Sequence, residues 1–266
     1  MKKTITVVFL AMIGWINGQE NLSYQQPSAE ILKLADYQRP PSVSMDSKRE
    51  WMIFSYRDTY KSLDELNQQE MRLGGLRINP VTNISSSLTY ITNLKIKKVK
   101  DKDETQVKGL PKGAKIAYTT LSPDEKKLAF TNTTDKGVEL WVLDLANATA
   151  TRLVADQLNA NLGMPYLWYK DSKNLLVKTI PQDKPKLIDS SKDLPTGPIV
   201  STSDGKVSQN RTYQDLLKNP QDEINFETLT KAELKKVNLN GTLTEVKATD
   251  LYTGMSFSPD GKYLML

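Results

Sequence analysis

Short apolar stretches alternate with compact polar turns along most of this chain. Near its end, the apolar pairs at Met255–Phe257 and Tyr263–Leu264 are separated by the polar run Ser258–Lys262. Pro259 fixes φ for the second position of a type I turn, and Gly261 suits a left-handed position. The pattern therefore predicts a β-hairpin.

The same hairpin signal recurs upstream at intervals of tens of residues. A clear copy occupies Leu121–Leu128, and weaker copies occupy Val43–Lys48 and Trp168–Lys173. Each copy opens a block of short predicted strands. A hairpin unit repeated in this way is typical of repeat architectures, most naturally of a β-propeller.

The strand pattern between the turns fits four-stranded units. The cleanest unit contains Lys115–Leu121, Lys127–Thr133, Val138–Leu145 and Thr151–Val154. An earlier unit contains Ser42–Asp46, Trp51–Ser55, Ser87–Ile91 and Leu94–Val99. A later one contains Met164–Tyr169, Leu175–Ile180, Glu233–Leu239 and Thr242–Val246. A further unit opens at Tyr252 and is left unfinished, so residues 42–266 are predicted to be all-β, a partial β-propeller of about three and a half blades of short antiparallel four-stranded sheets.

Two polar stretches interrupt this pattern. Asp58–Met71 is polar and helix-prone, and we interpret it as a loop excursion. The insert at about residues 181–231 is rich in Pro, Asp, Ser, Gln and Asn, and its one regular piece is predicted at Arg211–Lys218. An excursion of this size between strands exceeds ordinary loop length, which favours either a functional element or a mobile surface segment.

The N-terminal region differs from the rest. Residues 1–18 resemble a secretory signal peptide, with Lys2 and Lys3 before an apolar run that is too short to span a bilayer. Residues 19–41 form a lead-in with a short helix, where Ser28 is the predicted cap and Ile31, Leu32 and Leu34 face inward. We therefore expect an exported protein, periplasmic or secreted after cleavage, with no stable membrane insertion.

Composition narrows the chemistry. The 266 residues include no cysteine and no histidine. Disulfides, thiolate metal sites and cysteine nucleophiles are excluded, and a Ser-His-Asp triad cannot be built from these residues. The net charge of +5 is spread along the chain, and the alternating Lys95–Lys100 run is typical of a strand with a solvated face. The sequence predicts no cofactor, no metal and no nucleic-acid partner.

Remaining candidate sites are weak. Ser203 and Lys206 have the spacing of a Ser-Lys dyad but lie in a polar loop that would not desolvate the lysine. The pair Asp222-Glu223 lies in a polar run that favours solvation over acid–base catalysis. Leu73–Leu76 is interpreted as a strand bend. Three tryptophans in predicted strands favour packing between blades over a ligand platform; they are Trp51, Trp141 and Trp168.

Three segments carry a further signal: Leu73–Ile78, Gly109–Ile116 running into Leu121–Asp124, and Arg211–Lys218 followed by Asp222-Glu223 and Phe226-Glu227. With the repeated turns, they resemble a known family, the exported S9 or prolyl oligopeptidase serine peptidases with an N-terminal propeller. Together they look like the glutamyl endopeptidase branch of that family. The resemblance covers the chain from about residue 27 onward. A glutamate-preferring peptidase needs a cation for an acidic side chain, and Arg211 is our substrate-binding candidate. Capping of the insert is the alternative role for Arg211.

The resemblance also limits what this chain can do. Family members carry a Gly-x-Ser-x-Gly nucleophile elbow, with its Asp and His, in a C-terminal α/β-hydrolase domain. The present chain contains neither that motif nor a histidine, so no catalytic residue is assigned. We expect a non-catalytic propeller fragment that gates peptide access to that domain, inactive as it stands. A TolB-like periplasmic propeller for protein binding or assembly is the alternative.

Overall fold

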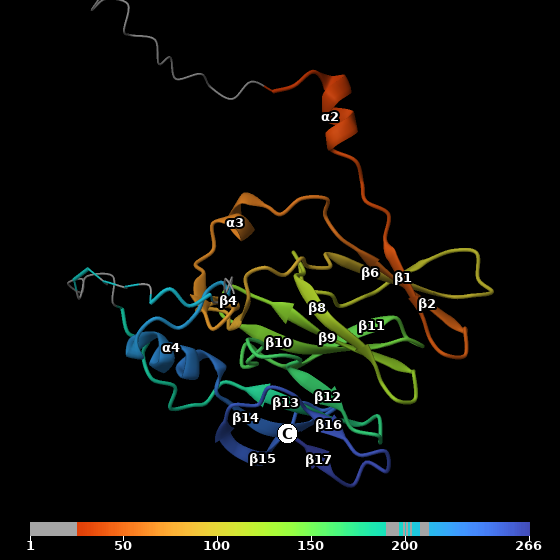
Figure 1. Cartoon of the computed structure of the whole chain (residues 1–266). Coiled ribbons are helices and arrows are strands. Elements are labelled where there is room, and N and C mark those ends of the chain that lie inside the picture. Colours follow the sequence, from red (N-terminus) through yellow and green to blue (C-terminus); the bar gives the residue numbers. More distant parts are fainter. Residues whose placement is uncertain (1–25, 190–196, 199, 201, 203, 208–212) are drawn as a thin grey trace, which may run out of the picture. The chain divides into compact units, whose positions relative to one another are not determined.

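The computed structural model describes residues 26–189, 197–198, 200, 202, 204–207 and 213–266 (Figure 1). The chain divides into two compact units, residues 1–38 and 39–266. The first unit contains α2 (Ala29–Ala35), but no residue of this helix is buried, and Ser28 makes no capping side-chain hydrogen bond. The predicted inward face of the helix is therefore wrong. The predicted signal peptide lies outside the described residues.

Three four-stranded antiparallel sheets repeat in the second unit, each pairing its strands in chain order. The first blade contains β1 (Ser42–Met45), β2 (Trp51–Tyr56), β6 (Asn93–Lys98) and β7 (Thr105–Gln106). The second contains β8 (Ile116–Leu121), β9 (Lys127–Thr133), β10 (Val138–Asp144) and β11 (Thr149–Val154). The third contains β12 (Tyr166–Trp168), β13 (Asn174–Thr179), β14 (Ala232–Asn238) and β15 (Leu243–Asp250).

A two-stranded hairpin follows the third blade, formed by β16 (Ser256–Phe257) and β17 (Leu264–Met265). The sheets succeed one another in the order of the chain (Figure 1). The predicted partial β-propeller, with three blades and the first hairpin of a fourth, is confirmed.

One turn type joins the first two strands of each blade and of the last hairpin. In the second blade, Asp124 Oδ1 accepts hydrogen bonds from Ser122 Oγ at 2.6 Å and from the Lys126 amide at 3.2 Å. The same bonds recur around Asp260. In all four turns, the residue at the equivalent position has a left-handed φ, between 55° and 74°. These residues are Arg49, Glu125, Ser172 and Gly261. The left-handed conformation expected for Gly261 is thus a property of the repeat.

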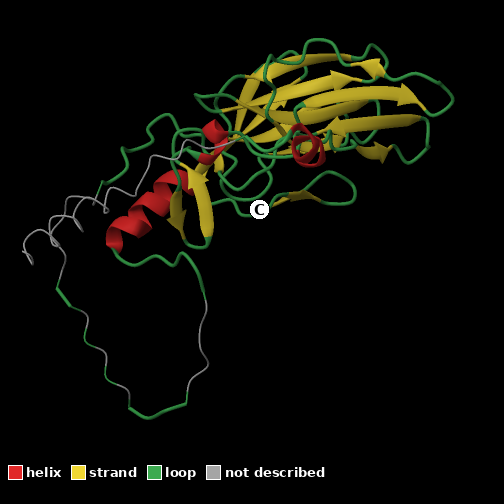
Figure 2. Ribbon diagram, turned by 90° about the horizontal axis from the view of Figure 1, so that it is seen from above, coloured by secondary structure: helices red, strands yellow, loops and turns green. Residues whose placement is uncertain are grey.

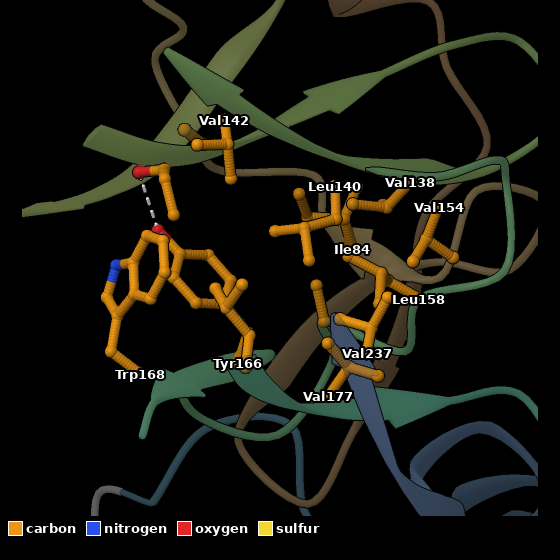
Figure 3. Packing of buried hydrophobic residues seen from close by; sticks show 14 of the residues in the cluster. Ile84, Val138, Leu140, Val142, Val154, Leu158, Tyr166, Trp168, Val177 and Val237 are labelled. Carbon is orange, nitrogen blue, oxygen red and sulfur yellow. Dashed lines mark hydrogen bonds between the residues drawn. The ribbon is translucent and has the colours of Figure 1, made fainter. Parts of the chain in front are cut away.

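Hydrophobic clusters fill the spaces between consecutive blades. One, between the first and second blades, includes Ile53, Ile96 and Phe130. Another, between the second and third blades, includes Leu140 and Val177 (Figure 3). The second blade packs one face on each of these two clusters, so both of its faces are buried. Its strand β9 is therefore buried along nearly its whole length.

A bulge in β8 shapes the contact between the second and third blades. Its pairing with β9 shifts between Ala117 and Thr120, and Tyr118 takes a φ of 50°. The Tyr118 carbonyl therefore lies within hydrogen-bond reach of the Tyr166 hydroxyl, whose single proton it shares with the Ala129 carbonyl, 2.8 Å from the hydroxyl oxygen. Burial raises the pKa of Tyr166 well above its ordinary value, so the hydroxyl stays protonated as a donor.

The tryptophans pack where the sequence predicts. Trp168 is buried beside Tyr166 (Figure 3). Its indole nitrogen donates to the Thr120 carbonyl at 3.3 Å. Trp51 and Trp141 are half-buried against the cluster between the first and second blades. Packing between blades is confirmed for all three.

Some predicted elements are wrong. Ser87–Ile91 is not a strand, although Ile91 makes an isolated bridge to Ile116. Arg211 and Thr212 lie outside the described residues, and residues 213–218 contain no helix or strand. Among the described residues of this insert, the regular element is α4 (Pro220–Thr230). The helix begins there because Asn219 accepts a hydrogen bond from the Asp222 amide and Pro220 suits the first turn.

No helix among the described residues is long and apolar enough to cross a bilayer.

Candidate functional site

Both long excursions leave the propeller at the same end. Insertion 1 (residues 57–92) joins β2 to β6, and insertion 2 (residues 180–231) joins β13 to β14. Each therefore connects the second and third strands of its blade. Because neighbouring strands in a meander run in opposite directions, these connections lie at the end of the sheets opposite the repeated turns. We call this the insertion end, and the other the turn end.

A small sheet forms most of the regular secondary structure of insertion 1. It contains β3 (Met71–Leu73), β4 (Leu76–Asn79) and β5 (Ile84–Ser85), preceded by the short helix α3 (Leu63–Leu66). The Gly74-Gly75 pair, with φ of 58° and 80°, closes a two-residue hairpin between β3 and β4. The predicted strand bend is thus a full reversal of the chain.

Insertion 2 packs directly on this hairpin. A Cβ on Gly74 would lie 3.0 Å from the Phe226 ring of α4, so glycine permits the close approach as well as the turn. The Gly75 amide donates to the Asp215 carbonyl at 3.1 Å. Figure 2 shows the long helix lying beside the small sheet. Two segments that carry the family resemblance, some 140 residues apart, therefore form one structure.

The joint core of the two insertions is apolar. Leu229 of α4 is fully buried against Leu73 and Ile78 of the hairpin. Leu217 and Phe226 pack on the same cluster from insertion 2. This cluster is separate from the clusters between the blades, so the insertions form a module with its own small core.

Side chains from the connection between the second and third blades hold the end of α4. The Asn159 amide nitrogen donates to the Leu229 carbonyl at 2.9 Å and to the Lys231 carbonyl at 2.8 Å. Asn161 also donates to the Leu229 carbonyl, at 2.8 Å. Helix ends leave carbonyl groups without partners in the helix, and these buried amides satisfy them.

A lysine links the start of insertion 2 to insertion 1. The Lys184 ammonium donates to Asn83 Oδ1 at 2.6 Å, and burial lowers the pKa of Lys184. The Asn83 carbonyl in turn accepts from the Ala160 amide at 2.9 Å. Lys184 also borders a cavity of about 420 Å³ beside α4, whose polar lining includes Glu223 and Glu227.

The hairpin carries a group of charged side chains. Arg72 and Arg77 lie directly opposite each other across β3 and β4. Arg72 Nε contacts Glu70 Oε1 at 2.7 Å, whereas Arg77 Nε lies 3.7 Å from Asp215 Oδ2. Hydrogen bonds from Ser86 and Arg72 lower the pKa of Glu70, so this carboxylate is charged at neutral pH.

The structure describes some of the candidate residues from the sequence and leaves others outside the described ranges. Arg211, the predicted substrate-binding residue, lies outside the described residues and stays a prediction. Ser203, interpreted as part of a polar loop, also lies outside them. Asp222 acts at the start of α4, where its carboxylate accepts from the Lys218 amide at 2.8 Å. Within the described residues, no three His, Cys, Asp or Glu side chains are grouped as a metal site.

Sequence reasoning missed the arginine pair. A Gly-Gly dipeptide between two apolar strands predicts a two-residue hairpin, and that hairpin places Arg72 opposite Arg77. The signal was therefore available. The asparagines that hold α4 had no such signal, because they are about 70 residues from the carbonyls that they bind.

Known proteins resemble this sequence over nearly its whole length. No family model matches the chain. A protein of Arabidopsis thaliana described as "Probable glutamyl endopeptidase, chloroplastic" is 32% identical over 257 residues, covering 91% of this chain and 26% of the relative. Its counterpart in Oryza sativa subsp. japonica is 31% identical, covering 92% and 27%. The chain thus spans about a quarter of the length of these curated relatives.

Solved structures with a similar chain course are more distant. Acylaminoacyl peptidase of Pyrococcus horikoshii, uncomplexed, is 14% identical with a TM-score of 0.40, covering 86% of this chain and 27% of that one. TolB from Acinetobacter baumannii is 13% identical with a TM-score of 0.35, covering 93% and 57%. At these TM-scores, neither neighbour bears on function.

The four-stranded meanders and their repeated turns define the chain as a propeller protein. Its sequence relatives match nearly the whole of its length, and both are named as peptidases. Over its propeller the chain is similar to these glutamyl endopeptidases, which supports its resemblance to the propeller portion of S9, or prolyl oligopeptidase, peptidases.

Proposed function

We propose that this chain is the propeller portion of an exported serine endopeptidase that cleaves peptides at glutamate. In this proposal the propeller restricts the access of peptides to a hydrolase domain encoded beyond residue 266. That domain supplies the Gly-x-Ser-x-Gly serine with its Asp and His, since these 266 residues contain no such motif and no histidine.

The observation that carries the proposal is the reach of the sequence match. It covers 91% of this chain, and both relatives are named glutamyl endopeptidase. The match is therefore not confined to the Ser-Pro-Asp turns that many propellers carry. Support also comes from the contact between Gly75 and Asp215, which joins two of the segments that resemble this branch.

The gene itself provides the first test. Its reading frame is followed downstream of Leu266, and the predicted outcome is a Gly-x-Ser-x-Gly motif with a later histidine. A stop codon with neither would overturn the peptidase proposal and favour a binding propeller of the TolB-like class.

Activity provides the second test. The longer protein should cleave a glutamate-containing peptide, and replacing its elbow serine by alanine should abolish that cleavage. The 266-residue chain serves as the matched control and should show no turnover. Turnover by the purified chain would contradict the placement of the nucleophile beyond residue 266.

Export is the remaining part of the proposal. It rests on the charged start and the apolar run of residues 1–18. Recovery of the protein from the periplasm or medium, with its N-terminus beginning near Gln19, is the expected result. Full-length protein retained in the cytoplasm would contradict export.

A further inference from the structure

Arg77 is a half-exposed cation without a hydrogen-bond acceptor among the described residues. Its side chain is 42% exposed, and its only ionic contact there is with Asp215, at 3.7 Å, which is too long for a hydrogen bond. A guanidinium carries five N–H donors in a fixed planar arrangement. These donors are therefore available to an acceptor that arrives from solution.

A second guanidinium lies next to it. Arg72 is directly opposite Arg77 in the hairpin and is 57% exposed. Like charges at opposite positions of a sheet destabilise it, so the pair has a cost in the free protein. Glu70 offsets part of that cost by binding Arg72 Nε at 2.7 Å, while Ser86 Oγ holds Glu70 at 2.5 Å.

The support under the pair is firm. The Gly74-Gly75 turn contacts Phe226 of α4 and is bonded to the Asp215 carbonyl. The inward-facing residues Leu73 and Ile78 are buried in the core of the insertion module. The arginines thus stand on a hairpin held from both insertions, which reduces the ordering needed when a ligand binds.

We propose that Arg77, with Arg72 beside it, binds a carboxylate side chain of an acidic peptide. This inference rests on the proposed function and names the residues that would read the acidic group. A carboxylate matches the geometry of a guanidinium, with two parallel N–H···O bonds. Glu70 and Asp215 lie within the same cluster and disfavour a doubly charged phosphate, so a singly charged carboxylate is the better ligand.

Asp215 has a separate role in this proposal. Its carboxylate is 16% exposed and faces Arg77 without bonding it closely. An incoming carboxylate therefore competes with Asp215 for the same cation. Asp215 weakens binding of every acidic ligand, and its removal should strengthen binding.

A peptide titration of the 266-residue chain tests the inference. The probe is a blocked pentapeptide with one central glutamate among alanines, and the matched peptide carries glutamine instead. Binding is followed by NMR shifts of amides in β3 and β4. The glutamate peptide should bind weakly, the glutamine peptide about tenfold more weakly still, and added salt should reduce the difference.

Three variants separate recognition from a merely structural role. Arg77→Gln should weaken binding of the glutamate peptide about tenfold. Arg57→Gln, which removes the same charge at the end of β2, should leave it unchanged. Asp215→Asn should tighten binding severalfold, whereas a structural pairing of Arg77 with Asp215 predicts that this variant harms both binding and thermal stability.

Several outcomes would overturn the inference. These are equal binding of the two peptides, no binding of the glutamate peptide, or an unchanged affinity in Arg77→Gln with native melting. None of them affects the proposed function, which depends on the downstream reading frame and the elbow serine. A missing hydrolase domain would contradict the proposed function, but it would not change the result of the peptide titration.

Discussion

The two ends of the blades are built from different kinds of contact. At the turn end, each Asp binds the backbone of its own turn, as Asp124 and Asp260 do within two residues. Contacts between turns are few, such as Ser47 Oγ to Glu125 at 2.7 Å. At the insertion end, Asn159, Lys184 and Phe226 all act on residues about 70 to 150 positions away.

The repeated turns and the insertion module therefore depend on the rest of the fold to different degrees. A turn that satisfies its own backbone can be copied in every blade with little regard to its neighbours. The insertion module depends on two blades being correctly placed, and it holds the charged hairpin. We therefore expect the insertion end to be the more easily disrupted part of the molecule, and the following predictions test that contrast.

The largest effect is expected from Leu229→Ala. Leu229 is fully buried in the small core of the insertion module, and shortening a buried leucine costs about 2–5 kcal/mol. Amide exchange should accelerate in α4, β3 and β4 while β9 and β10 stay protected. Leu63→Ala is the matched control, since Leu63 is 83% exposed. Equal acceleration in the blades would show that the module is not a separate cooperative unit.

A pH effect of about 2–3 kcal/mol is expected from Lys178, near the insertion end of β13. Its buried ammonium donates to the carbonyls of Leu162 and Tyr252, and burial lowers the pKa from 10.5 to about 8. Between these values the unfolded chain holds a proton that the folded chain has released. The free energy of unfolding should therefore rise with pH from about 8 toward 10.5.

Denaturant unfolding at pH 7.5, 9 and 10 measures this effect. Lys178→Met removes the titrating group and should flatten the profile over that range. A rise of the same size in Lys178→Met would assign the pH dependence to other groups.

At the turn end, Ser122→Ala should cost about 1–2 kcal/mol. The Ser122 hydroxyl is buried, donates to Asp124 and accepts from the Lys127 amide at 3.0 Å. Ser258→Ala in the last turn removes the equivalent bonds at a more exposed site, where water replaces them. Melting of both variants gives the comparison, and a larger loss for Ser258→Ala would contradict it.

The smallest effect is a gain. Arg49 has a φ of 58° in the first turn, where Gly261 stands in the last. Arg49→Gly should stabilise the chain by about 0.5 kcal/mol, because glycine adopts this conformation without a steric penalty. Lys48→Gly, at an adjacent position without a left-handed φ, should destabilise it instead. A loss of stability in Arg49→Gly would mean that the arginine side chain makes a stabilising contact.

Local signals predicted the blades well. The Ser-Pro-Asp turns and the predicted strand at Val138–Leu145 depend on residues close together in sequence. The secondary structure of the insert was harder to predict from the sequence. The sequence predicts the regular piece of the insert at Arg211–Lys218, whereas α4 begins at Pro220 after the Asn219 cap. The polar composition of Pro220–Thr230 offers no apolar face by which this helix could be recognised.

The repeat, the turns and the absence of a histidine or a Gly-x-Ser-x-Gly motif can be identified from the amino-acid sequence. The shared core of the two insertions and the exposed donors of Arg77 become visible only in the folded chain. The two groups of features differ in the distance along the chain between the residues that make contact. A turn is stabilised by its own backbone, whereas a contact such as Gly75 to Asp215 exists only after the blades between them have folded.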